Sequence, residues 1–148
     1  MLVKKLQTLR AERARGEHGF TLIELLVVVV IIGILIAIAI PLYLNYQKGA
    51  KNSTAASDTR NAVAAVEACY SMNANTYPVT ASATGPATAP LSCPTINDQK
   101  INVSPGNVLT YAPSVSPATG YTVSTVAGSP GTKTYKYDSA SGQTTSTG

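Results

Sequence analysis

The sequence predicts an α+β fold in which a long N-terminal α-helix packs on a small C-terminal antiparallel β-sheet. Three observations predict this fold. Leu25–Ile40 contains no polar side chain, and a stripe of residues at spacings of three and four follows it. Nearer the C-terminus, glycine and proline separate three short β-like runs. The 148 residues give enough length for one domain with a modest core.

The apolar run is long enough to cross a membrane. Leu22 and Ile23 precede this run and Pro41–Leu44 extend it, so that Leu22–Leu44 gives about 23 residues, and a helix needs about 20 to span a bilayer. The helix is apolar all round, so the segment 20–44 must lie in lipid or inside a bundle of helices. Basic residues before Phe20 place the N-terminus in the cytoplasm and the rest of the chain outside.

An ordinary secretory signal peptide is the alternative interpretation of the run. Its cleavage site would be Ala37-Ile38-Ala39, and a soluble domain would begin near Ile40. Three features oppose it: the carboxylate of Glu24 at the start of the run, an apolar pattern that continues to Tyr46, and the small-before-bulky pair Gly19-Phe20 at the boundary.

The positive charge lies mainly before the apolar run. The formal net charge is +4, and five of the eleven basic residues precede Phe20. Without them the chain is close to neutral, so the net charge gives no argument for nucleic-acid binding. Lys133 and Lys136 alone are too few for a basic patch, which leaves nucleic acid open as a partner.

Cys69 and Cys93 are the two cysteines of the chain. In a chain that leaves the cytoplasm such a pair persists as a disulfide. The bridge would close a loop of about 25 residues and add roughly 3–4 kcal/mol to the free energy of unfolding. Two free thiols are the alternative. The sequence predicts no metal site, cofactor or enzymatic activity, because it has no histidine near the cysteines and no nucleophile–base set, phosphate loop or paired carboxylates.

The N-terminal third of the chain resembles the type IV pilin family, which includes the pseudopilins. The resemblance rests on Gly19-Phe20-Thr21-Leu22-Ile23-Glu24, on the apolar run that follows, and on Gly33 and Pro41 within the helix. It implies that residues 1–19 are a leader, and that a prepilin peptidase cuts between Gly19 and Phe20. It also implies that this enzyme methylates the new amine of Phe20.

The resemblance further implies a structural subunit that waits among the lipids of the cytoplasmic membrane. The subunit would then polymerise with copies of itself into an extracellular pilus for motility, adhesion or DNA uptake. Its partners would be the prepilin peptidase and the inner-membrane assembly machinery with its ATPases. Two other functions stay open. One is a pseudopilin or minor pilin of a type II secretion or competence system. The other is an electron-conducting pilus that uses Phe20, Tyr43 and Tyr46.

Glu24 is an ionisable group in a membrane helix and therefore needs a partner. Cleavage would create one, the free amine of Phe20, about a turn away in the same chain or in a neighbour. Such pairing would favour one axial register between adjacent helices, so processing would have to precede assembly. The alternative is a carboxylate at the membrane interface that reaches water.

Residues 45–75 are predicted to form the amphipathic half of the helix, which is expected to end near Asn73-Ala74-Asn75. Pro41 should kink the helix, and Gly33 is a second weak point. The predicted buried stripe consists of Ala56, Thr59, Val63, Val66 and Tyr70. The residues predicted to lie between these positions are Lys51, Asp58, Arg60, Asn61 and Glu67.

The C-terminal head is predicted in three parts. Residues 76–107 are expected to form an irregular loop, because the segment 78–95 is rich in alanine, threonine, serine and proline. Residues 108–138 are predicted to form an antiparallel meander. Residues 139–148 have no apolar side chain except Ala140 and are expected to be a flexible tail. The strands of the meander are Val108–Tyr111, Tyr121–Val126 and Lys133–Tyr137.

Overall fold

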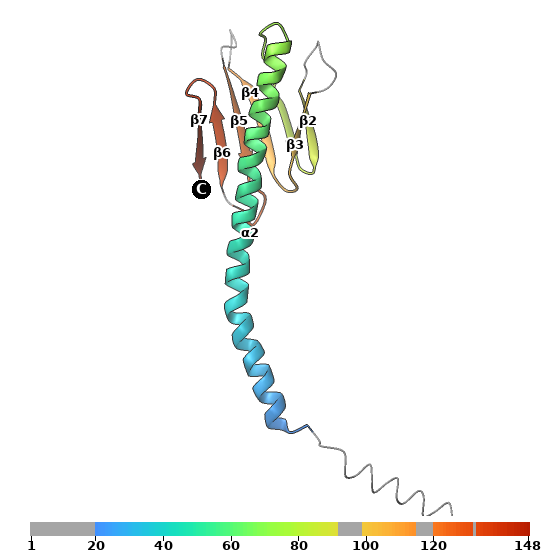
Figure 1. Ribbon diagram of the computed structural model, residues 1–148, viewed down its shortest axis with the longest axis vertical. Coiled ribbons are helices and arrows are strands. Elements are labelled where there is room, and N and C mark those ends of the chain that lie inside the picture. Colours follow the sequence, from blue (N-terminus) through green and yellow to red (C-terminus); the bar gives the residue numbers. More distant parts are fainter. Residues whose placement is uncertain (1–19, 92–98, 115–119, 132) are drawn as a thin grey trace, which may run out of the picture. The chain divides into compact units, whose positions relative to one another are not determined.

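The computed structural model describes residues 20–91, 99–114, 120–131 and 133–148 (Figure 1). The described elements are one long helix and seven strands, which confirms the predicted α+β fold. The chain divides into two compact units, Met1–Pro41 and Leu42–Gly148, and each unit is described by itself.

Helix α2 spans Leu22–Met72 and continues through both Gly33 and Pro41. In the first unit, every described residue is exposed. The predicted kink at Pro41 falls at the boundary between the two units and stays a prediction. The helix ends close to the predicted position. Just beyond it, Ala74 and Asn75 take positive φ angles of 49° and 57°, and the backbone N–H of Asn75 donates to the Tyr70 carbonyl at 3.2 Å.

The buried stripe of α2 is rotated by about one residue from the predicted stripe. Thr59 and Val66 are buried as predicted, but Ala56, Val63 and Tyr70 are only half-buried. Several of the buried residues, including Ala55, Ala62 and Cys69, are small, which lets the helix approach the sheet closely. The buried positions of the helix are Ala55, Asp58, Thr59, Ala62, Val66 and Cys69.

Five strands form an antiparallel sheet in the order β1-β4-β5-β6-β7, over which the second half of α2 lies (Figure 1). The predicted meander is confirmed as β4-β5-β6, with Thr110 opposite Ser124 and Ser124 opposite Lys136. The alternate residues Tyr121, Val123 and Thr125 of β5 are buried, as the period of two in a strand requires. The strands span Ala81–Thr84 (β1), Val108–Pro113 (β4), Tyr121–Val126 (β5), Thr134–Asp138 (β6) and Gln143–Thr147 (β7).

The predicted irregular loop over 76–107 is wrong, because this range contains three strands. Besides β1, it contains β2 (Ala87–Leu91) and β3 (Gln99–Val103), which pair with each other as a separate two-stranded sheet. In β3, Ile101 and Val103 alternate and are buried, a short signal that the sequence did carry. β1 consists of alanine, serine and threonine, so only its backbone ladder to β4 makes it a strand.

The prediction of a flexible tail over 139–148 is also wrong. β7 lies in this range and pairs with β6 along its whole length, although every one of its side chains is exposed. A turn at Asp138 starts the strand: the backbone N–H of Ala140 donates to the Asp138 carboxylate at 2.9 Å, and that of Gly142 to the Asp138 carbonyl at 2.9 Å. Backbone pairing therefore orders a segment that has no hydrophobic anchor.

Tyrosines dominate the core of the head. Tyr121 is buried, and its ring centroid lies 5.2 Å from Tyr77, 5.8 Å from Tyr111 and 5.7 Å from Tyr137. Its hydroxyl donates to the Glu67 carboxylate at 2.8 Å. Burial, followed by the hydrogen bond to Glu67, raises the pKa of Tyr121 well above its ordinary value, and burial does the same for the pKa of Tyr111. Both phenols are therefore neutral donors at physiological pH.

Asn107, in the turn between β3 and β4, joins three other parts of the head and has no exposed surface. Its side-chain N–H groups donate to Asp58 at 2.8 Å and to Thr54 at 3.3 Å, both on α2. Its side-chain oxygen accepts from the backbone N–H of Gly128 at 2.9 Å, and its carbonyl accepts from that of Gly85 at 2.9 Å. One residue thus ties the helix to the β5–β6 loop through its side-chain amide and to the β1–β2 turn through its backbone carbonyl.

Asp58 was predicted to lie among the solvent-facing residues, but only 3% of it is exposed. Its carboxylate accepts from the backbone N–H and the hydroxyl of Ser104, both at 2.9 Å, in addition to Asn107. A buried carboxylate is tolerated only where donors replace its water, and the β3–β4 turn supplies three of them. Hydropathy assigns any aspartate to the surface, so the sequence pattern could not reveal this contact.

Close backbone approach at this point requires glycine. A Cβ added to Gly85 would overlap the backbone of Val103 and Ser104, and Gly106 holds a φ of +86° in the turn that carries Asn107.

Replacing Asp58 with alanine should lower the free energy of unfolding of the head by about 2–4 kcal/mol, because three donors would lose their acceptor in a buried site. Urea unfolding of the detergent-solubilised chain, followed by the near-UV circular dichroism of the tyrosines, measures this loss. Arg60→Ala is the control, since Arg60 is exposed on the same helix. Equal unfolding midpoints for the two variants would contradict the importance of the network.

Candidate functional site

The N-terminus of α2 is closed by a reciprocal pair of side chain–backbone hydrogen bonds. Thr21 precedes the first helical residue, Leu22, and Glu24 is the third residue of the helix. The Glu24 carboxylate accepts from the Thr21 backbone N–H at 2.9 Å and from the Thr21 hydroxyl at 2.8 Å. The Thr21 hydroxyl in turn accepts from the Glu24 backbone N–H at 3.3 Å. This arrangement is a capping box.

The capping box gives Glu24 a partner that the charge argument missed. The predicted partner was the free amine of Phe20, which would exist only after cleavage. In the intact chain the carboxylate is held by Thr21 instead. The pattern Thr-x-x-Glu before an apolar run is itself a helix-start signal, so the sequence already contained this information. The pairing of Glu24 with the Phe20 amine stays a prediction.

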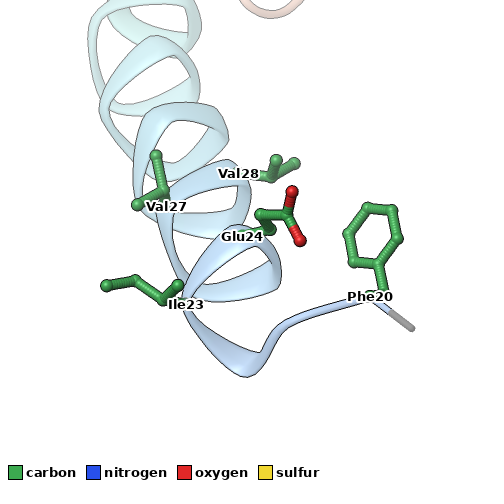
Figure 2. A pocket seen from close by; sticks show the side chains of 5 residues that line it. All are labelled: Phe20, Ile23, Glu24, Val27 and Val28. Atoms are coloured by element: carbon green, nitrogen blue, oxygen red, sulfur yellow. The ribbon is translucent and has the colours of Figure 1, made fainter. Parts of the chain in front are cut away.

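Phe20 and Glu24 lie at a shallow hollow on the surface of the first unit (Figure 2). Figure 2 shows the carboxylate of Glu24 on the same side of the helix as Phe20 and Val28. The other two lining residues are Ile23 and Val27, so the carboxylate is the polar group in an otherwise apolar lining. Gly19, the other half of the predicted cleavage site, lies outside the described residues.

The apolar segment of α2 has no cover within its own unit. Large apolar side chains are exposed along it, with Leu22 at 81% and Ile38 at 65%. Among the described residues, α2 is the one helix that is long and apolar enough to cross a membrane. A continuous apolar surface of this length is unstable in water, so lipid or other protein must cover it.

The two predicted flexible positions, Gly33 and Pro41, both lie inside α2. A Cβ added to Gly33 would meet no atom within 4 Å, so packing within the chain does not require a glycine there. Whether either position loosens the helix stays a prediction.

Of the predicted disulfide, only Cys69 belongs to the described residues. It is fully buried in the core cluster of the head. Cys93 lies in the range 92–98, outside the described residues, and the bridge stays a prediction.

The aromatic residues proposed for conduction do not form a described stack. Tyr43 and Tyr46 are 62% and 71% exposed, and the Tyr43 hydroxyl accepts from the Gln47 side chain at 2.7 Å. The ring contacts of the described residues lie in the head, where Tyr70 stacks on Tyr77 with centroids 4.3 Å apart. Sequence reasoning missed this head cluster, because its tyrosines are far apart along the chain.

Most of the capped, exposed apolar segment of α2, which begins at Leu22, lies within a known sequence motif. The family described as "Prokaryotic N-terminal methylation motif" matches residues 14–40. The N-terminal segment of this chain carries that motif. It includes the capping box and most of the exposed apolar run.

The motif is shared with pilins of known name. The type IV major fimbrial protein FimA of Dichelobacter nodosus is 53% identical over 53 residues, which are 36% of this chain and 34% of that protein. The type IV major pilin protein PilA of Myxococcus xanthus is 47% identical over 54 residues, 36% of this chain and 24% of that protein.

A secretion protein is similar in the same way. The type II secretion system core protein G of Pseudomonas aeruginosa is 42% identical over 66 residues, 45% of this chain and 46% of that protein. The chain thus matches between about a quarter and a half of the length of these curated relatives. No solved structure matches the chain.

Replacing Thr21 with alanine should fray the first turn of α2, because the helix loses its N-cap. Amide hydrogen exchange of the detergent-solubilised chain should speed up about five-fold at the Glu24 N–H. Thr21→Ser keeps a hydroxyl at the cap and should exchange like the unmodified chain. Equal exchange rates in Thr21→Ala and Thr21→Ser would show that the capping box does not hold the turn.

Proposed function

We propose that this chain is the precursor of a structural subunit of a type IV pilus. The observation that carries the proposal is the methylation motif at the start of an exposed apolar helix whose first turn holds a carboxylate. The similarity to major pilins over this segment supports the same conclusion. The subunit is not an enzyme but the substrate of one.

In this proposal a prepilin peptidase removes residues 1–19 and methylates the amine of Phe20. The precursor waits in the cytoplasmic membrane with its N-terminus in the cytoplasm. Cleavage removes five basic residues and creates a cationic amine near the carboxylate of Glu24. That amine can pair with Glu24 of its own chain or of a neighbour, and an uncompensated charge among apolar helices is costly.

Assembly follows from the uncovered helix. Copies of α2 replace lipid around each other, and head-to-tail contacts between identical subunits generate an open helical filament. Apolar area changes little when a helix moves from lipid into a bundle of similar helices, so packing and charge pairing decide the association. The assembly machinery of the inner membrane and its ATPases would drive export of the growing filament.

A pseudopilin is the second candidate. The similarity to the type II secretion core protein G favours it, since that match covers a larger share of both chains than the pilin matches do. The motif is common to both groups, so the amount of surface filament discriminates between them. An abundant band in sheared filaments supports the pilus subunit, and a scarce, cell-bound protein supports the pseudopilin.

The proposed processing predicts the mass of the mature protein. The chain recovered from the cell surface should begin at a methylated Phe20, as determined by intact mass and N-terminal sequencing. Gly19→Val should block the cut, because a branched side chain would obstruct the peptidase, and should leave the precursor in the membrane. A mature protein that begins near Ile40 would instead establish an ordinary signal peptide.

The charge of Glu24 can be separated from its role in the cap. Glu24→Gln keeps an acceptor for Thr21 but removes the charge. This variant should stay in the membrane and be cleaved, yet form far fewer filaments, by at least about ten-fold in a shearing assay, since one unpaired buried charge is worth more than 1.4 kcal/mol.

Glu67→Gln is the matched control, because it removes one carboxylate and keeps an acceptor for Tyr121. It should assemble normally. Normal piliation in Glu24→Gln would remove charge pairing from the mechanism and leave Glu24 as a capping residue.

A further inference from the structure

Three lysines gather where the head meets the membrane-proximal part of α2. Lys48 and Lys51 lie three residues apart on α2, so they occupy neighbouring positions on its surface. Lys133 lies beside the same turn, because its backbone N–H donates to the Asn52 side chain at 3.2 Å. We call Lys48, Lys51 and Lys133 the lysine base.

A contact with the head holds part of the lysine base in place. The Lys51 ammonium donates to the Pro105 carbonyl at 2.8 Å, which uses one of its three N–H donors. Lys48 and Lys133 are exposed. The loop that carries Pro105 is the one that holds Asn107, so the buried network fixes the place of this ammonium group.

The acidic residues that the structure describes in the second unit do not offset this charge. Asp58 is buried and satisfied by Ser104 and Asn107. Glu67 lies about 24 Å along the helix from Lys51, and Asp138 lies about 17 Å along its strand from Lys133. Both distances exceed the Debye length of about 8 Å at physiological ionic strength.

Two exposed tyrosines indicate where the lysine base would lie relative to a membrane surface. Tyr43 and Tyr46 lie at the end of the apolar segment, and tyrosine is enriched where a helix leaves the hydrocarbon core. Lys48 lies about 10 Å along the helix beyond Pro41. Along α2, apolar residues, then tyrosines, then lysines therefore follow in the order of the layers of a membrane surface.

We propose that the lysine base docks the head of the membrane-bound chain on the phosphate groups of anionic phospholipids. This inference rests on the proposed membrane anchoring of α2. An ammonium group carries three N–H donors and no acceptor atom, and Lys51 uses one of these donors on Pro105. The remaining donors suit phosphate oxygens, and each lysine contributes about a five-fold preference for an anionic surface. An acidic patch on a second copy is the competing partner, but among the described acids of the second unit Glu67 and Asp138 lie far from the lysine base, and Asp58 is buried.

The reactivity of the lysine amines tests the proposal residue by residue. The full-length chain is placed in nanodiscs of phosphatidylcholine, with or without about one-third phosphatidylglycerol, and treated with an amine-acylating reagent. Mass spectrometry then gives the extent of modification at each lysine. With phosphatidylglycerol, Lys48 and Lys133 should react about five-fold more slowly, and 0.5 M salt should abolish this protection. Lys136, exposed on β6, should react equally in both lipids.

A charge-matched pair of variants controls for general electrostatics. Lys48→Gln should weaken the protection of Lys133. Arg60→Gln removes the same charge about 18 Å farther along α2 and should leave the protection intact. Equal reactivity of Lys48 and Lys133 in the two lipids, or equal effects of the two variants, would overturn the proposal. Protection of Lys48 and Lys133 in discs of phosphatidylcholine alone, if it depends on contact between copies, would also overturn the proposal.

The experiment also separates this inference from the proposed function. A chain that does not enter nanodiscs contradicts the membrane anchoring itself. A chain that enters them but shows no lipid-dependent protection overturns only the docking of the head.

Discussion

One continuous helix has to satisfy two different environments, and the rest of the molecule follows from this constraint. Between Leu22 and Leu44 its large side chains are exposed and apolar, so this part is complete only when lipid or other helices surround it. From Ala55 onward, one stripe is covered by the chain's own sheet. The sequence changes character between these parts, from an all-round apolar surface to small and polar residues with one buried face. The molecule therefore combines a folded domain, whose core is covered, with a helical segment whose apolar surface is not covered.

Two kinds of contact hold the sheet on α2. Toward the end of α2, tyrosine rings pack around Tyr121, whose hydroxyl reaches Glu67. Nearer the middle of α2, Asp58 and Asn107 form a buried polar network with Ser104 and the glycine turns. Apolar contacts tolerate small shifts, whereas a buried carboxylate with three donors has one good geometry. The polar network therefore fixes the position of the sheet along the helix.

Much of this organisation can be predicted from the sequence, and the failures have physical causes. The apolar run, the end of α2 and the strands β4, β5 and β6 follow from periodicity and from glycine and proline. β1 and β7 do not, because small hydroxyl and methyl side chains carry no hydrophobic alternation, and backbone pairing with a neighbour creates these strands. Asp58 was placed on the wrong face, since hydropathy treats every aspartate as exposed. At the candidate site, the sequence predicts the importance of Glu24. The charge of Glu24 indicates the Phe20 amine as its partner, whereas the pattern Thr-x-x-Glu indicates Thr21, which holds the carboxylate in the structure.

The capping box also sets the N-terminal limit of the helix, and a protease cuts more easily outside that limit. Exposed, irregular segments are the preferred sites of proteolysis, and a helical bond must first unwind before it can be cut. Phe20 lies outside the helix, and Thr21 and Glu24 stop the helix from extending toward it. A cut on the amino side of Phe20 therefore demands no unwinding of α2. In the proposed processing both partners of the cap would remain on the product, so the shortened chain would keep the N-terminal closure of its helix.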